Sequence, residues 1–206
     1  MSQITQGYKK IVDNFINWAS TQNNIIGVMI IGSQARDDHP ADKWSDLDLW
    51  IITTDPDLYL SATGWIEKIE KPLITFQQGV LDSGRERKVL FTNGLDVDFA
   101  FDTPEQFQKS LQDTTILDII RRGINIILDK DGEITQAINN LPQFSFPKPP
   151  TQAEFHELIH IFWYRAQWAA KRLRRGELWV GKRSCDTTMK ELLITIIEWH
   201  TRASNG

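Results

Sequence analysis

The residues best suited to chemistry in this sequence are acidic side chains that follow a Gly-Ser pair. Asp46 and Asp48 follow Gly32-Ser33 after twelve residues, at the start of a predicted strand. Side chains alternate along a strand, so the two carboxylates share a face and lie roughly 7 Å apart along the chain. Two carboxylates this close repel each other unless a cation lies between them, and hard oxygen ligands suit Mg²⁺. The pattern therefore predicts a divalent-cation site.

A third acidic strand follows later in the chain. Asp96 and Asp98 share one face of this strand, while Leu95, Val97 and Phe99 occupy the other. We therefore expect the acids of the two strands to meet on one side of a sheet, away from the apolar side chains.

The Gly-Ser pair itself is suited to a phosphate group. Gly32 permits a tight turn in which the backbone can approach a ligand closely. Ser33 can offer its hydroxyl and its amide to a phosphate at the start of a helix.

Short apolar runs predict the elements that position these residues. The β-branched run Ile25–Ile31 is typical of a buried strand, and Leu47–Thr53 is typical of a second strand. Lys88–Thr92 and Leu95–Phe101 flank Asn93-Gly94, a pair favoured in tight primed turns, so they predict a hairpin. Periodicity predicts three more elements: a helix at Tyr8–Ala19, a helix at Thr114–Arg122 and a strand at Ile124–Leu128.

The chain changes character after a proline-rich stretch. Residues 141–150 contain four prolines and read as a linker between a domain at 1–140 and a domain at 151–206. Beyond it, Thr151 and Glu154 form a capping-box pattern ahead of helical periodicity that ends near Gly176. A second helix is predicted at about Thr187–Trp199. We therefore expect an α+β (α/β) fold with a mixed sheet flanked by helices, followed by a helical C-terminal domain.

Composition narrows the classes of function. The 206 residues include 41% hydrophobic residues and one cysteine, Cys185, which suits a folded protein in a reducing compartment. Residues 1–110 hold 16 Asp and Glu against 10 Lys and Arg, which argues against a nucleic-acid partner. No segment resembles a signal peptide or a membrane span, so we expect a cytoplasmic protein with no membrane partner. The oligomeric state is not predicted.

A Gly-Ser pair, Asp-x-Asp on the next strand and an acid on a later strand resemble the nucleotidyltransferase superfamily related to DNA polymerase beta. The finer resemblance is to the aminoglycoside 6-adenylyltransferases, or streptomycin adenylyltransferases. The matching motifs run in order from about residue 25 to 200: Ile31-Gly32-Ser33, Asp46-Leu47-Asp48, Gly94 with Val97-Asp98, Ile127 to Gly132, Phe162-Trp163, and Leu192-Leu193 to Glu198-Trp199.

The resemblance implies a nucleotidyltransferase-type sheet. It also implies an enzyme that moves AMP from ATP to a hydroxyl of an aminoglycoside-like molecule and releases pyrophosphate. Asp46 and Asp48 would hold metal ions, two Mg²⁺ about 4 Å apart, that bridge the ATP phosphates. Asp98 matches the third family carboxylate, which shares a metal or takes the proton from the acceptor hydroxyl, and Asp96 ranks behind it. Ser33 with Gly32 would bind a phosphate. Arg36 and, from the second domain, Lys190 are further candidate ATP contacts.

Family members generally continue beyond the final tryptophan into more helices that wall the antibiotic site. The helical domain is therefore expected to be a truncated form, or one with a smaller acceptor pocket.

Three other functions fit parts of the pattern. A toxin–antitoxin-type nucleotidyltransferase that acts on a protein would share the acids, although minimal members lack the two C-terminal helices. A non-catalytic nucleotide-binding module would be expected to lose some of the acids. His156-Glu157-Leu158-Ile159-His160 matches the zinc motif H-E-x-x-H, but no third ligand follows at the usual spacing, which disfavours a zinc peptidase.

Overall fold

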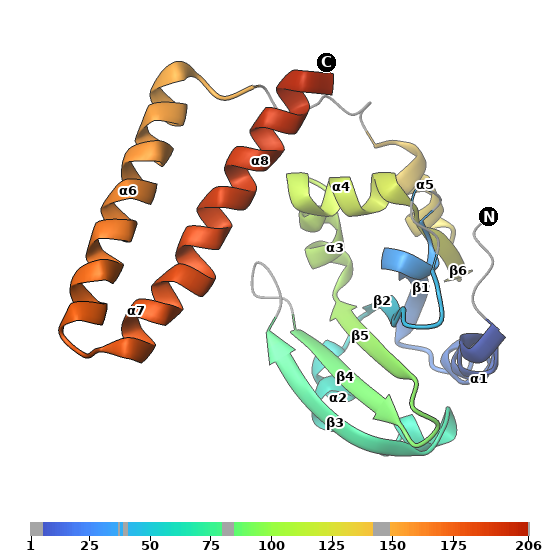
Figure 1. The fold of residues 1–206 in the computed structure, drawn as a ribbon. Helices are drawn as coiled ribbons and strands as arrows, with labels where there is room; N and C mark the ends of the chain where they lie inside the picture. Colours follow the sequence, from blue (N-terminus) through green and yellow to red (C-terminus); the bar gives the residue numbers. More distant parts are fainter. Residues whose placement is uncertain (1–5, 37, 39–40, 80–84, 142–148, 206) are drawn as a thin grey trace. The chain divides into compact units, whose positions relative to one another are not determined.

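The computed structural model describes residues 6–36, 38, 41–79, 85–141 and 149–205. The chain divides into two compact units, Met1–Pro142 and Gln143–Gly206 (Figure 1). Most of the predicted linker at 141–150 lies outside the described residues. In the described part of the chain, no helix combines the length and the apolar character needed to cross a membrane.

The N-terminal unit is built on a mixed sheet, as predicted, and this sheet has six strands (Figure 1). Its strands are β1 (Ile25–Ile31), β2 (Leu47–Thr53), β3 (Pro72–Gly79), β4 (Arg85–Phe91), β5 (Asp96–Asp102) and β6 (Asn125–Asp129). The order across the sheet is β3-β4-β5-β2-β1-β6. Strands β2 and β5 pair in parallel, whereas the other neighbours are antiparallel.

Helices supply a hydrophobic core on each face of this sheet. They are α1 (Gln6–Ser20), α2 (Pro56–Ser61), α3 (Pro104–Ser110), α4 (Thr114–Arg122) and α5 (Glu133–Asn139), with 3-10 turns at Gly32–Gln34 and Ile66–Lys68. Side chains of α1, α2 and the Ile66–Lys68 turn form the first core with alternate residues of the strands. Side chains of α3, α4 and α5 form the second core on the opposite face.

The first core is rich in aromatic side chains. Phe15 of α1 is fully buried, and its ring lies 5.3 Å from that of Phe99 and 6.3 Å from that of Trp65, centroid to centroid. Ring pairs at these separations add to the free energy gained from burying their area. The helical period of α1 therefore fixes this helix to the sheet.

The second core corrects one expectation about the acidic face of β2. That face was predicted to lie away from any core, because Leu47 and Leu49 point to the other side. Trp50 and Ile52 follow Asp48 on the same face, yet both are buried against the second core. The acids thus lie where this core ends, and the strand is apolar on both faces over the rest of its length.

The hairpin between β4 and β5 is present, but its turn differs from the predicted one. The carbonyl of Phe91 accepts from the amide of Gly94, and the amide of Phe91 donates to the carbonyl of Leu95. Gly94 has φ +82°, so the loop spans three residues and ends on a left-handed glycine. A two-residue Asn93-Gly94 turn would have shifted the pairing of the two strands by one residue.

Several short elements have no counterpart in the predictions. Helices α2, α3 and α5 are six or seven residues long and show too few turns for apolar periodicity. Side-chain caps stabilise two of them: Asp55 accepts from the amide of Leu58, and Thr103 and Gln106 form a capping box. Strand β3 has little buried surface, so it lacks the alternation that marks a half-buried strand.

The C-terminal unit contains α6 (Gln152–Arg174), α7 (Leu178–Ser184) and α8 (Lys190–Asn205), with a π-helical turn at Cys185–Met189. The capping box predicted at Thr151 and Glu154 is present. The predicted helix at Thr187–Trp199 begins too late and ends too early, because helical structure runs from α7 through the π turn into α8. Within this unit, Phe155 of α6 lies beside Trp199 of α8, with ring centroids 6.5 Å apart.

Replacing Phe15 with Ala should remove the centre of the first core. We expect the free energy of unfolding to fall by about 3–5 kcal/mol, because a buried ring is lost and its cavity stays largely open. Phe76→Ala on β3 is the matched control, since that ring is 50% exposed and its loss should cost about 1 kcal/mol or less. Urea unfolding of both variants measures the difference, and equal losses would contradict this view of the core.

Candidate functional site

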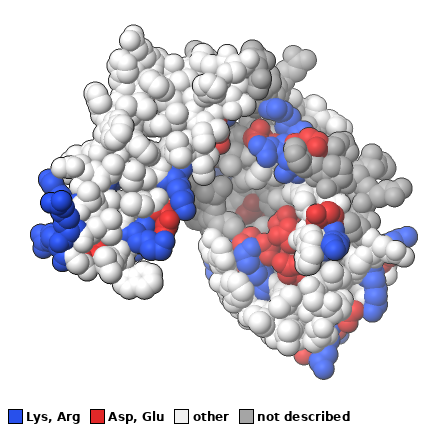
Figure 2. Space-filling view, in the orientation of Figure 1, with Lys and Arg blue, Asp and Glu red and all other residues white. Residues whose placement is uncertain are grey.

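Three aspartates of the N-terminal unit converge at the end of the second core. Asp48 on β2 lies directly opposite Asp98 on the parallel strand β5, and Asp46 precedes β2 by one residue. One carboxylate oxygen from each of Asp46, Asp48 and Asp98 lies within 4.8 Å of the other two. We call these three residues the acid triad. Figure 2 shows acidic side chains gathered on part of the surface of this unit.

The oxygens of the acid triad lie close enough together to be brought onto one divalent cation. Around one octahedral Mg²⁺, ligand oxygens are separated by at most about 4.2 Å, twice the metal–oxygen distance of about 2.1 Å. The triad oxygens all lie within 4.8 Å of one another, so side-chain rotations can bring them onto one ion. The residues present therefore fit a hard divalent cation.

The Gly-Ser turn is tied to the start of β2. The side-chain amide of Gln34 donates to the backbone carbonyl of Asp46 at 3.1 Å, and the hydroxyl of Ser33 lies 3.5 Å from the same oxygen. Gln34 is 1% exposed, so its hydrogen bond is shielded from water. These bonds hold Asp46 in place beside the turn.

Gly32 has a steric reason to be glycine. Its φ is +67°, a conformation that other residues rarely adopt. A β-carbon at this position would lie 2.2 Å from Oδ2 of Asp48, which is well inside van der Waals contact. The absence of a side chain thus lets the turn lie directly against the acid triad.

A second glycine, Gly123, packs against the residues that follow the Gly-Ser turn. Gly123 ends α4 with φ +147°, and a β-carbon there would lie 2.1 Å from the carbonyl oxygen of Ala35. The end of α4 therefore packs against the residues that follow Ser33. The local sequence marks Gly123 only as the end of a basic helix turn, because its packing against Ala35 is a tertiary contact.

Lys88 is the principal site residue that the sequence reasoning missed. It lies on β4 directly opposite Asp98, and its ammonium forms an ion pair with that carboxylate. It also contacts Oε1 of Glu86 at 3.0 Å, and Glu86 is 8% exposed. A two-residue turn at Asn93-Gly94 would instead pair Lys88 with Phe99, which places its side chain on the other face.

Burial and mutual repulsion shape the charge state of the triad. The pKa of Asp48 rises from 3.8 to about 7, first because the carboxylate is buried and then because Asp46 and Asp98 are negatively charged. Lys88 opposes this rise. Burial lowers the pKa of Lys88 itself, but its hydrogen bonds to Asp98 and Glu86 more than compensate, so that pKa lies above its usual value. Lys88 therefore stays cationic.

The other predicted site residues have varied surroundings. Arg36 makes a two-point ion pair with Asp38, at 2.8 and 3.0 Å. Asp96 accepts a hydrogen bond from the hydroxyl of Tyr8 at 3.3 Å and is not one of the three converging carboxylates. Lys190 belongs to the C-terminal unit, where it pairs with Asp186 at 3.1 Å.

The histidines of the H-E-x-x-H pattern lie exposed on α6. Among the described residues, the acid triad is the one group of three or more potential ligand side chains that is close enough to hold a metal ion. His156 and His160 therefore have no described third ligand, and the zinc interpretation gains no support.

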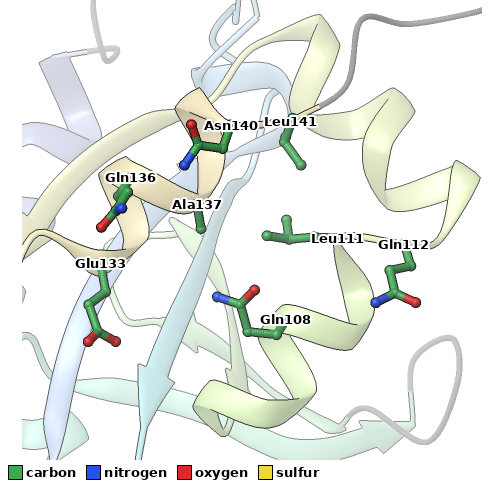
Figure 3. A pocket seen from close by; sticks show the side chains of 8 residues that line it. All are labelled: Gln108, Leu111, Gln112, Glu133, Gln136, Ala137, Asn140 and Leu141. Carbon is green, nitrogen blue, oxygen red and sulfur yellow. The ribbon is translucent and has the colours of Figure 1, made fainter.

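An open groove between α3 and α5 is separate from the acid triad. Figure 3 shows the eight side chains that line it: Gln108, Leu111, Gln112, Glu133, Gln136, Ala137, Asn140 and Leu141. The lining is dominated by neutral amides and contains one carboxylate. None of the three aspartates contributes to it, so the groove offers no chemistry of its own.

Comparison with known proteins adds a family assignment to this geometry. A family model described as streptomycin adenylyltransferase matches residues 5–206. The chain is 22% identical over 206 residues to an aminoglycoside 6-adenylyltransferase of Staphylococcus aureus, covering 96% of this chain and 71% of that protein. It is also 22% identical to the Campylobacter jejuni protein of the same name, over 93% of this chain and 66% of that one.

A solved structure of an aminoglycoside 6-adenylyltransferase from Bacillus subtilis is also similar, with a TM-score of 0.42 and 17% identity. That match covers 92% of this chain and 65% of the solved one. The chain spans about two thirds of the length of the curated relatives that it matches.

Replacing Asp48 with Asn should stabilise the metal-free protein in a pH-dependent way. Because the pKa of Asp48 is raised in the folded state, the wild-type protein loses stability relative to the Asp48→Asn variant as the pH rises from about 4 to about 7. Above pH 7 the variant should be more stable by on the order of 3 kcal/mol, and this gain should shrink as the pH falls toward 4. Unfolding in the presence of EDTA measures it. Asp13→Asn, which removes an exposed carboxylate of α1, is the control, and a destabilised Asp48→Asn would contradict the argument.

Replacing Gly32 with Ala should displace the carboxylate of Asp48. We expect stability to fall by about 1–3 kcal/mol and Mn²⁺ affinity to fall as well, because the new β-carbon occupies the place of Oδ2. Gly132→Ala is the matched control, since Gly132 has φ +79° with nothing within 4 Å of the added atom. Both substitutions place a β-carbon on a residue with positive φ, so they share the same backbone strain. An equal Mn²⁺ affinity in the two variants would count against the close approach of Gly32 to Asp48.

Proposed function

Because the chain belongs to the streptomycin adenylyltransferase family, we propose that it transfers AMP from ATP to a hydroxyl of an aminoglycoside and releases pyrophosphate. The observation that carries the proposal is the convergence of Asp46, Asp48 and Asp98 beside the Gly-Ser turn. The names of the similar proteins support the choice of acceptor.

The acid triad would hold divalent cations, with Mg²⁺ as the physiological ion. Two such ions neutralise charge on the entering and leaving oxygens of an in-line displacement at phosphorus. Asp46 and Asp48 would act as ligands from the same strand face. The protein contributes position and charge more than covalent chemistry, which suits a site built from a rigid sheet.

Asp98 is assigned here as a metal ligand in preference to a general base. Lys88 already holds one of its oxygens, so that oxygen is not free to take the proton of an acceptor hydroxyl. The carboxylate of Asp98 is also one of the three that lie close enough together to share a cation. The acceptor hydroxyl would then be activated by the positive charge of the bound cations.

The Gly-Ser turn would receive the phosphates. Gly32 brings the backbone next to the triad, and Ser33 offers a hydroxyl that is bound only weakly, 3.5 Å from the carbonyl of Asp46. Arg36 would have to leave Asp38 in order to bind a phosphate. Carboxylates and phosphates can both accept two hydrogen bonds from one guanidinium. Lys190 remains a prediction for the C-terminal unit.

The acceptor is proposed to be a cationic sugar. Residues 1–110 carry an excess of six acidic side chains, and a negative potential raises the local concentration of a polycation. Aminoglycosides combine several ammonium groups with many hydroxyls, so they match both the field and the reaction.

Incubation with ATP, Mg²⁺ and streptomycin or a related aminoglycoside should release pyrophosphate and give an acceptor that carries one AMP. Asp46→Asn should lower the rate by at least about a hundredfold, because a carboxylate ligand is lost. Asp96→Asn is the matched control, since this acid lies on β5 with Asp98 but outside the triad, and it should stay near the wild-type rate. Mass spectrometry of the acceptor reads out the product. No adduct across a broad aminoglycoside panel, from protein that binds Mg²⁺ and ATP, would refute the choice of acceptor.

A further inference from the structure

Lys88 is held between two acids at the edge of the triad. Its ammonium contacts Asp98 on the neighbouring strand and Glu86 two residues earlier on its own strand. The side chains of Lys88, Glu86 and Asp98 are only 28%, 11% and 15% exposed. The ammonium therefore has little water around it, and both of its partners are fixed to β-strands.

The charges of Lys88 and Glu86 act on the triad as a whole. Lys88 is paired with Asp98, and the carboxylate oxygens of Asp98, Asp46 and Asp48 all lie within 4.8 Å of one another. Four carboxylates and one ammonium thus share a partly buried region. In such a region, charges a few ångströms apart interact far more strongly than they do in water.

We propose that Lys88 is a built-in counter-cation of the acid triad. Its ammonium holds one oxygen of Asp98, and its positive charge makes divalent-cation binding depend on the negative charge of a triphosphate. The inference rests on the proposed function, because it assumes that the triad takes metal ions and a nucleotide.

Two effects of the ammonium oppose a divalent cation in the absence of nucleotide. It occupies an oxygen of Asp98 that a metal ion could otherwise use, and its charge repels a second cation placed beside it. The phosphates of ATP would offset that repulsion. Lys88 thereby acts as a positioning residue, since it works through Asp98 and not on the reacting atoms.

Lys88→Met tests the inference by removing the charge while keeping a side chain of similar length. Mn²⁺ binding, followed by electron paramagnetic resonance without nucleotide, should tighten by about tenfold or more. Lys88→Arg should restore wild-type affinity, because it returns the charge. Lys10→Met is the control, since it removes a lysine from the ion pair with Glu70, and that pair involves none of the triad.

A second variant guards against loss of folding. Lys88→Met combined with Glu86→Gln keeps the local net charge and frees both oxygens of Asp98. It should fold like the wild type and still bind Mn²⁺ more tightly. An unchanged or weaker Mn²⁺ affinity in the folded double variant would overturn the inference.

The same titration with α,β-methylene-ATP separates the inference from the proposed function. In the wild type the analogue should strengthen Mn²⁺ binding, whereas in Lys88→Met it should strengthen it much less. Wild-type protein that binds no Mn²⁺ even with the analogue would refute the proposed metal-dependent function itself. Wild-type binding with an equal nucleotide effect in Lys88→Met would refute only the role of Lys88.

Discussion

Mutual repulsion among Asp46, Asp48 and Asp98 is the constraint to which the N-terminal unit is adapted. Three carboxylates with oxygens within 4.8 Å cost free energy when they are charged and partly buried. The parallel pairing of β2 with β5 forces Asp48 against Asp98 regardless of that cost. The strain persists because two hydrophobic cores hold the strands together.

The position of the triad at the end of the second core gives it one dry side and one open side. Trp50, two residues beyond Asp48, is buried and donates its indole N–H to Asp102 at 2.9 Å. Water is therefore excluded from the strand just beyond the acids. A charge bound at such a boundary is felt more strongly than on an open surface, while a ligand can still reach it from solvent.

The strands and the acids could be predicted because both depend on local alternation. Asp46 with Asp48 and Asp96 with Asp98 each follow the period of two, and Gly94 marks the hairpin. Lys88 could not be predicted, because its face depends on whether the turn holds two residues or three. The helices α2, α3 and α5 were not predicted for a different reason. They are too short to show apolar periodicity, and caps and tertiary contacts stabilise them.

The hairpin also bears on the order in which the site assembles. Lys88 and Asp98 are ten residues apart and join through a three-residue loop, whereas Asp48 and Asp98 are fifty residues apart and join through parallel pairing. Closing the shorter loop costs less entropy, so we expect the hairpin to form ahead of the parallel contact. The charge of Asp98 is then already balanced when β2 docks, and the nascent sheet is spared the full repulsion of an unpaired third acid.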